Sequence, residues 1–344
     1  MRIGLDHYTI AHRDFTPEAT LAFACEHGFG GVQFLEPSSL DEKLDPERLQ
    51  AIAKTAVDLR LYLEIGLPSP NPTRRARAEE REISAEEHAR DLVPHVRAVA
   101  AMGCTHARVY IGDRHDRFRS QPSWDVQLDA TLDVLKRLAP ALRDLNVKVA
   151  IETHADLTLH ELLRLINVLP EEVAGVTLDT GNLAMRLDDP VEVVKRLAPR
   201  VLGTHVKDAV LARTPRGLCW QARPVGAGIL PMAELLEPLI RANPQLHFSI
   251  ELHPRIYDLP IHDPSWLAYF PSHNLPAILD LADQCERRFA EGSLLHPQAV
   301  EAIPWADRDL VGLAQSLGYL KTLLPALADL STRLDSSGAF RVVE

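Results

Sequence analysis

The strongest constraint on the fold of this chain is a regular alternation of short apolar segments with longer amphipathic ones. Eight runs have the length and the branched or aromatic composition of β-strands, and they lie at residues 2–6, 31–36, 61–66, 106–112, 147–153, 175–180, 201–206 and 247–252. Alternation of this kind is typical of a parallel sheet with crossover helices. Eight such units predict an α/β fold, a (β/α)8 TIM barrel of about 250 residues.

The predicted helices carry start signals at the expected places. Thr16 precedes Pro17, Asp45 precedes Pro46, and Ser84 is followed three residues later by a glutamate. Small polar residues in this position accept hydrogen bonds from the first free amide groups of a helix, and proline suits its first turn. A long helix is expected from about Ser123 to Leu145.

A doubly wound open sheet is the competing architecture, but no GxGxxG motif follows the first strand. We therefore expect a barrel domain over residues 1–290. Beyond it, residues 291–344 form a predicted C-terminal helical extension, with leucines at helical spacing at 310, 313, 317, 320 and 324. Packing against the barrel is the favoured role of this helix, and a contact with a neighbouring subunit is the alternative.

Composition narrows the class of protein. The formal net charge is −11 over 344 residues, which argues against nucleic acid as a partner because such binding relies on a basic surface. No apolar run approaches the roughly 18 residues of a membrane span, and the N-terminal residues lack the apolar core of a signal peptide. The four cysteines are scattered, with no CxxC pair, so a cytoplasmic protein without disulfides is expected.

Four of the apolar runs end in side chains that can bind a metal ion. They are Glu152, Asp179, His205 and Glu251. The first three are spaced by 27 and then 26 residues, about one strand–helix unit each. Because catalytic groups of a TIM barrel lie at the carboxyl ends of its strands, these side chains should meet at one mouth. Any one of them alone would more often be a cap or a salt-bridge partner.

Three carboxylates and one imidazole form a mostly oxygen donor set. Such a set suits Mn²⁺, Mg²⁺ or Co²⁺ better than a structural zinc ion, and we expect one divalent metal ion, with Mn²⁺ first. Open coordination positions would remain for a substrate.

Other polar residues near the strand ends are candidate substrate contacts. Asn182 lies three residues after Asp179, Lys207 and His154 each follow a proposed ligand by two residues, and His7 closes the first strand. Each of these is as readily explained by a structural role in its loop.

Residues 217–229 read GLCWQARPVGAGI and supply Arg223 three residues before Gly226. Two close glycines allow the backbone to approach a ligand, and an arginine can bind a carboxylate, a phosphate or a sugar hydroxyl. A single GxG motif is otherwise usually a turn.

These residues carry a resemblance to the xylose isomerase-like barrel superfamily, the sugar phosphate isomerase/epimerase group. In its ketose 3-epimerases a glutamate, an aspartate, a histidine and a second glutamate on strands five to eight bind one divalent metal. The resemblance assigns these roles to Glu152, Asp179, His205 and Glu251, and assigns a substrate-binding role to Arg223. It also implies a small-molecule carbohydrate or sugar-acid substrate, and a homo-oligomer, because dimers and tetramers are common among similar barrels.

The sequence departs from the epimerases at Asn182, where they commonly carry histidine, so the substrate preference is open. The motifs LDTGN, DDP, THVKD, PRG and WQ are similar to those of a narrower branch that includes 3-oxo-isoapionate decarboxylase. Apurinic endonucleases of the superfamily use additional histidines and an aspartate, and here Gln221, Arg223 and Asn182 occupy those positions. A DNA substrate is disfavoured.

Three functions remain open on the sequence. The first is a metal-dependent sugar isomerase or epimerase working through a metal-stabilised enediolate, with Glu152 and Glu251 transferring protons. The second is a metal-dependent decarboxylase, a lyase of a branched 3-oxo sugar acid, in which Arg223 or Lys207 holds a carboxylate. The third is a barrel that binds sugar or metal without catalysis.

Overall fold

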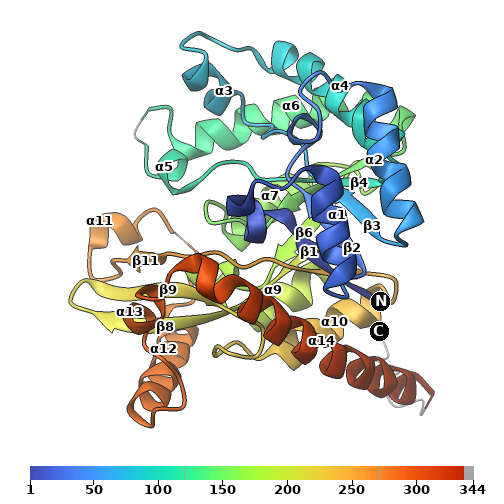
Figure 1. Cartoon of the computed structure of the whole chain (residues 1–344). Helices are drawn as coiled ribbons and strands as arrows, with labels where there is room; N and C mark the ends of the chain where they lie inside the picture. Colours follow the sequence, from blue (N-terminus) through green and yellow to red (C-terminus); the bar gives the residue numbers. More distant parts are fainter. Residues whose placement is uncertain (120, 271, 337–344) are drawn as a thin grey trace.

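The computed structural model describes residues 1–119, 121–270 and 272–336, and its centre is a barrel of parallel strands (Figure 1). The eight barrel strands are β1 Arg2–Asp6, β2 Gly31–Phe34, β3 Tyr62–Ile65, β4 His106–Val109, β5 Lys148–Glu152, β6 Ala174–Asp179, β7 Val201–Val206 and β10 His247–Ile250. Each coincides with one of the eight predicted runs, within a few residues at its ends.

The strand order is β3-β2-β1-β10-β7-β6-β5-β4, and every neighbouring pair in it is parallel. The two ends of this sheet approach each other just beyond β3, where the amide of Leu67 donates a 2.8 Å hydrogen bond to the carbonyl of Arg108. The barrel is therefore nearly closed, which confirms the predicted TIM barrel and directs the carboxyl ends of all eight strands to one mouth.

Helices surround the strands. The α-helices are α1 Pro17–Glu26, α2 Pro46–Asp58, α3 Pro72–Ala78, α4 Ala85–Ala101, α5 Arg114–Arg117, α6 Trp124–Asp144, α7 Leu159–Ile166, α8 Asn182–Met185, α9 Pro190–Leu197, α10 Met232–Ala242, α11 Pro264–Leu267, α12 Leu275–Ala290, α13 Pro297–Glu301 and α14 Trp305–Ser336. Among the described residues, 3-10 helices lie at His7–Arg13, Pro37–Ser39 and Ala198–Arg200.

The start signals act as predicted in three of these helices. The side chains of Thr16, Asp45 and Ser84 each accept a hydrogen bond from an amide of the first turn that follows. Ser123 does precede α6, but its side chain makes no capping hydrogen bond. Local capping chemistry thus sets where most of the long helices begin, and the apolar faces of the helices then pack on the strands to form the core.

A small antiparallel sheet lies beside the barrel and was not predicted. It consists of β8 Asp208–Thr214, β9 Gly217–Arg223 and β11 Ile256–Leu259, in the order β11-β9-β8. Residues 217–223, for which no secondary structure was predicted from the sequence, form a strand. In the turn that follows, the amides of Gly226 and Gly228 both donate hydrogen bonds to the carboxylate of Asp208. These glycines therefore bind a side chain of the protein itself.

The C-terminal helix α14 packs on the barrel, next to α10, β1 and β10 (Figure 1). Leu313, Leu317, Leu320 and Leu324 are buried, as expected for a helix with one core-facing side, whereas Leu310 is 37% exposed. Asp309 fixes the start of the helix to the first unit through an ion pair of 2.6 Å with Arg13. Residues 337–344 of the predicted extension lie outside the described residues.

One finding qualifies the expectation about membranes. The part of α14 over Trp305–Leu330 is long and apolar enough to cross a membrane by length and composition alone. Leu313, Leu317, Leu320 and Leu324 of this stretch are buried against the barrel, and 39% of its most apolar window is buried in all. A single helix of this kind is weak evidence for a membrane span.

Candidate metal centre and substrate cleft

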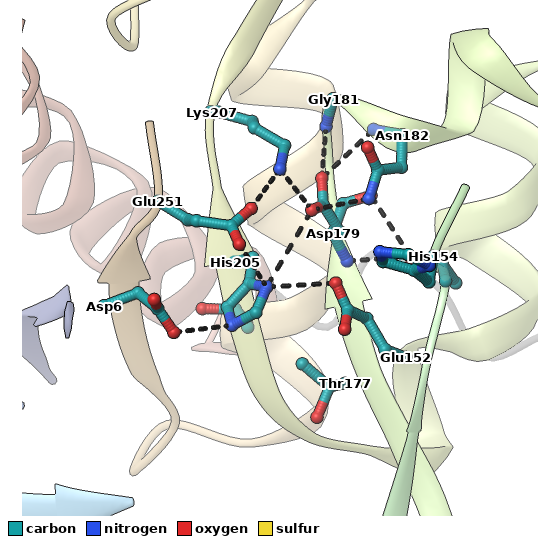
Figure 2. Close-up of polar contacts among 12 residues, drawn as sticks. Asp6, Glu152, His154, Thr177, Asp179, Gly181, Asn182, His205, Lys207 and Glu251 are labelled. Atoms are coloured by element: carbon teal, nitrogen blue, oxygen red, sulfur yellow. Dashed lines mark hydrogen bonds and ion pairs between the residues drawn. The ribbon is translucent and has the colours of Figure 1, made fainter. Parts of the chain in front are cut away.

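The four predicted ligands meet at the carboxyl end of the barrel, each delivered by its own strand. Glu152 ends β5, Asp179 ends β6, His205 lies near the end of β7, and Glu251 follows β10. Nδ1 of His205 lies 3.1 Å from Glu152, 3.8 Å from Asp179 and 3.7 Å from Glu251, measured to carboxylate oxygens (Figure 2). Ligand atoms of Glu152, Asp179 and His205 all lie within 4.8 Å of one another, so the cluster can hold a metal ion.

His205 is oriented by a second set of contacts on the other side of its ring. Its Nε2 lies 3.2 Å from a carboxylate oxygen of Asp6 and contacts the side-chain oxygen of Gln33. An Nε2–H that is held by a carboxylate leaves Nδ1 free to bind a metal, which is the usual arrangement of a histidine ligand. Burial alone would lower the pKa of His205, but Glu251 and Glu152 raise it well above its usual value.

The carboxylate of Asp179 is held by the loop that follows it. The amides of Gly181 and Asn182 donate to its Oδ1 at 2.9 and 3.0 Å, and the side-chain amide of Asn182 donates to its Oδ2 at 2.8 Å. Asn182 therefore positions the carboxylate of Asp179, one of the predicted metal ligands. A Cβ at position 181 would lie 2.7 Å from Cγ of Lys207, so the lysine side chain would have to shift to make room for it.

Lys207 places an ammonium group between two of the ligands. Its Nζ lies 2.7 Å from Asp179 and also contacts Glu251, although the side chain is only 1% exposed (Figure 2). Burial would lower the pKa of Lys207, but Asp179 and Glu251 raise it well above its usual range. A cation thus already stands among these carboxylates, which shows that the donor set fits a positively charged occupant.

Glu152 forms an ion pair with a buried arginine, Arg108. Arg108 of β4 donates a 2.8 Å hydrogen bond from Nη1 to Glu152, and both side chains are buried. Burial raises the pKa of a carboxyl group, but Arg108 and His205 together hold the pKa of Glu152 well below its usual range. Lys207 and His205 outweigh burial in the same way and lower the pKa of Glu251. Both glutamates are therefore carboxylates at neutral pH.

A cavity of about 310 Å³ opens over this cluster. Of the predicted substrate contacts, His154, Asn182 and Lys207 line it, together with both ligand glutamates. Nδ1 of His154 is held by Asp156 at 2.8 Å.

Two predicted contacts do not line this cavity. His7 is half-buried against Phe34 at a ring-centroid distance of 5.6 Å, and its neighbour Tyr8 lines the cavity instead. Arg223, at the end of β9, lines a separate cavity of about 430 Å³ and donates a 2.7 Å hydrogen bond to the carbonyl of Leu295.

Several residues of the site were missed by reasoning from the sequence. Asp6, Gln33 and Arg108 are polar residues within the short strands β1, β2 and β4, which was the available signal. Arg74 and Tyr110 also line the cavity; Arg74 lies in α3, and Tyr110 belongs to the predicted run 106–112 but follows the end of β4. Arg74 pairs with Asp113 at 3.2 Å, a contact that depends on how α3 meets the loop after β4.

Comparison with protein families and solved structures is consistent with this geometry. The family model described as xylose isomerase-like TIM barrel matches residues 21–268. The chain is 27% identical over 252 residues to 3-oxo-isoapionate decarboxylase of Pectobacterium atrosepticum, covering 71% of this chain and 82% of that protein.

Solved structures give a likeness of fold. An L-ribulose 3-epimerase matches with a TM-score of 0.60 at 16% identity, covering 100% of this chain and 99% of its own. The IolI protein with a bound zinc atom matches with a TM-score of 0.53 at 16% identity, covering 86% of this chain and 100% of its own.

Proposed function

The chain belongs to the xylose isomerase-like TIM barrel family, and from that premise we propose that it is a divalent-metal-dependent enzyme of sugars or sugar acids, acting through an enediolate. The observation that carries the proposal is the meeting of three carboxylates and one imidazole nitrogen beside a cavity. A bound divalent cation would supply the positive charge that stabilises the two oxygens of an enediolate. Glu152, Asp179, His205 and Glu251 would hold it, with Mn²⁺ the expected ion.

Decarboxylation of a 3-oxo sugar acid fits the charges of the site best. Loss of CO₂ leaves an electron pair on the neighbouring carbon, and the only further requirement is a proton for that carbon. Lys207 carries a proton in a buried position next to Glu251, so its ammonium group is the proposed donor. Arg108 lines the same cavity and would bind the substrate carboxylate. The similarity to 3-oxo-isoapionate decarboxylase, which covers 71% of this chain and 82% of that protein, supports this reaction.

Isomerisation or epimerisation is the second candidate, supported by the two glutamates that both lie within 4 Å of Nδ1 of His205. One glutamate would remove a carbon-bound proton, and an acid on the opposite face would return one. Glu152 and Glu251 are the proposed pair. Because cations hold both as carboxylates, one of them would have to take up a proton from Lys207 or from the substrate before it could act as the acid.

The two reactions separate in one experiment. The Mn²⁺-loaded protein is incubated in D₂O with candidate ketoses and 3-oxo sugar acids, and CO₂ and deuterated products are measured. Stoichiometric CO₂ release from an oxo acid supports the decarboxylase, whereas deuterium at a sugar carbon without CO₂ supports the isomerase or epimerase.

Glu251→Gln is the matching variant, because it keeps the shape of the side chain and removes its charge. Loss of a metal-dependent turnover in Glu251→Gln would exclude a barrel that only binds sugar or metal. If no substrate of either class is converted by the wild type, while metal still binds, the non-catalytic function stands and the proposed enzyme is wrong.

A further inference from the structure

The cavity over the metal ligands continues into a second cavity of about 300 Å³, here called the arm. Both cavities are lined by Tyr8, His154 and Tyr257, so they form one continuous cleft. The metal ligands line only the first part. A substrate bound at the metal centre would therefore extend its far end into the arm.

The lining of the arm includes three arginines that have no acidic partner among the described residues. Arg114, Arg186 and Arg255 line it, and within residues 1–119, 121–270 and 272–336 none of them forms an ion pair. Two acidic residues also line the arm, but both are already paired with other arginines. Asp113 lies 3.2 Å from Arg74, and Asp258 lies 3.0 Å from Arg216. The unpaired charge of the arm is positive.

Arg186 is the buried member of this group. It follows α8 and is only 3% exposed, yet its Nε and Nη1 have no hydrogen-bond partner among the described residues. Its guanidinium carbon lies 5.6 Å from the centroid of the Phe270 ring. A buried guanidinium with free N–H groups is strongly unfavourable unless an anion or another acceptor meets it.

The acids near Arg186 are engaged elsewhere. Glu161 pairs with Arg117 at 2.7 Å. Asp156 accepts hydrogen bonds from the amide of Gly112 and from His154, and Asp188 accepts one from the amide of Leu159. Arg186 therefore lacks a close counter-charge of its own, and the arm is the open space beside it.

We propose that the arm binds an anionic group, a carboxylate or a phosphate, at the end of the substrate remote from the metal ligands, and that Arg186 holds it with Arg114 and Arg255 at the rim. Guanidinium groups bind carboxylate and phosphate oxygens through paired N–H donors. This inference rests on the proposed function for the position of the substrate, and it narrows the substrate class to acidic or phosphorylated sugars.

Binding of unreactive sugar analogues tests the inference apart from catalysis. Xylitol, D-xylonate and xylitol 5-phosphate are titrated into the Mn²⁺-loaded protein and followed by calorimetry. We expect at least one of the two anions to bind about tenfold or more tightly than xylitol, since charge-assisted hydrogen bonds to a buried arginine are strong. Whichever of D-xylonate and xylitol 5-phosphate binds more tightly shows whether the arm prefers a carboxylate or a phosphate.

Arg186→Met should remove most of the difference in affinity between the anion and xylitol, and it should leave the affinities for xylitol and Mn²⁺ unchanged. Arg137→Met, on the exposed side of α6, is the matched control and should keep this difference in affinity. Equal binding of all three analogues by the wild type would overturn the inference. So would an anion advantage that survives in Arg186→Met, because that anion would be bound at the metal centre.

If Arg186→Met does not fold, Arg114→Met decides in its place, since this rim residue is exposed and its replacement leaves no buried charge. A reduced preference for the anion supports the arm, and an unchanged preference contradicts it. The outcome is independent of turnover. A protein that prefers anions through Arg186 but converts no substrate would refute the proposed function and leave the arm standing, whereas turnover of neutral sugars without anion preference would do the opposite.

Discussion

Single residues at the proposed metal centre depend on polar and charged neighbours. Glu152 of β5 is ionised because Arg108 of β4 lies 2.8 Å away, and Asp179 keeps its orientation through Asn182. Removing one member of such a buried pair leaves the other charge without compensation, which costs more than the pair itself contributes.

Replacing Arg108 by methionine should therefore destabilise the protein by about 3–5 kcal/mol when metal is absent. The loss should be clearly smaller in the Mn²⁺-loaded protein, because the cation offers Glu152 another positive charge. Urea denaturation with and without Mn²⁺ measures both values. Arg137→Met removes only an exposed ion pair with Asp133 and should change stability by less than about 1 kcal/mol. An equal loss with and without metal would contradict the prediction.

The raised pKa of Asp188 leads us to expect that the stability of the protein depends on pH. Burial raises the pKa of its carboxyl group to about 7, whereas the unfolded chain has an ordinary value near 4. The folded state thus binds the extra proton between these two values, so this residue makes the protein less stable as pH rises from about 4 to 7. The lost stability is not regained above pH 7.

Asp188→Asn removes this titration and keeps an oxygen for the amide of Leu159. The stability of the variant relative to the wild type should rise from pH 5 to pH 8. Urea denaturation at intervals of one pH unit provides the measurement, and two curves that stay parallel over the range would show that Asp188 does not titrate there.

At the scale of elements, α14 belongs to the barrel core although it follows the eighth strand–helix unit. Leu320 is fully buried in its face toward the barrel, and Trp305 donates a hydrogen bond from its indole nitrogen to the carbonyl of Thr9. The helix therefore covers part of the first unit, as the packing role favoured from the sequence requires.

Leu320→Ala should lower the free energy of unfolding by about 2–5 kcal/mol, the usual loss for a buried leucine. Val311, on the same helix but 67% exposed, is the control, and Val311→Ala should change stability by less than about 1 kcal/mol. Unfolding should remain a single transition monitored by circular dichroism and by tryptophan fluorescence. A separate early transition in Leu320→Ala would show that residues 291–336 fold as a unit of their own.

At the scale of the whole molecule, the four proposed ligands come from strands β5, β6 and β7 and from the end of β10, and they meet at the barrel mouth. A cation that binds them favours the folded state, because the unfolded chain does not bring the ligands together. At an Mn²⁺ concentration one hundred times its dissociation constant, the added stability is about 2.7 kcal/mol.

Addition of Mn²⁺ to the chelator-treated protein should therefore raise the midpoint of thermal unfolding, and EDTA should reverse the rise. Asp179→Asn should abolish most of this shift, since it removes a charged ligand and retains the shape of the side chain. Scanning calorimetry gives the midpoints. A shift of the same size in Asp179→Asn would mean that the metal binds elsewhere.

The amino-acid sequence by itself determined the periodic features of this protein. Alternating apolar runs, caps such as Thr16 and ligands such as Asp179 at strand ends are local patterns, and in a barrel the end of every parallel strand points to the same mouth. The eight strands, most of the helix starts and the meeting of the four ligands could for that reason be predicted.

The tertiary structure alone decided which further side chains join them. Arg108 reaches Glu152, and Asp6 reaches His205, only because barrel closure sets the register between strands that are far apart in the chain. Arg223 turns away because residues 217–223 pair as a strand, and Arg186 reaches the arm through the packing of α8. Such distances depend on packing between elements, which no local pattern of residues encodes.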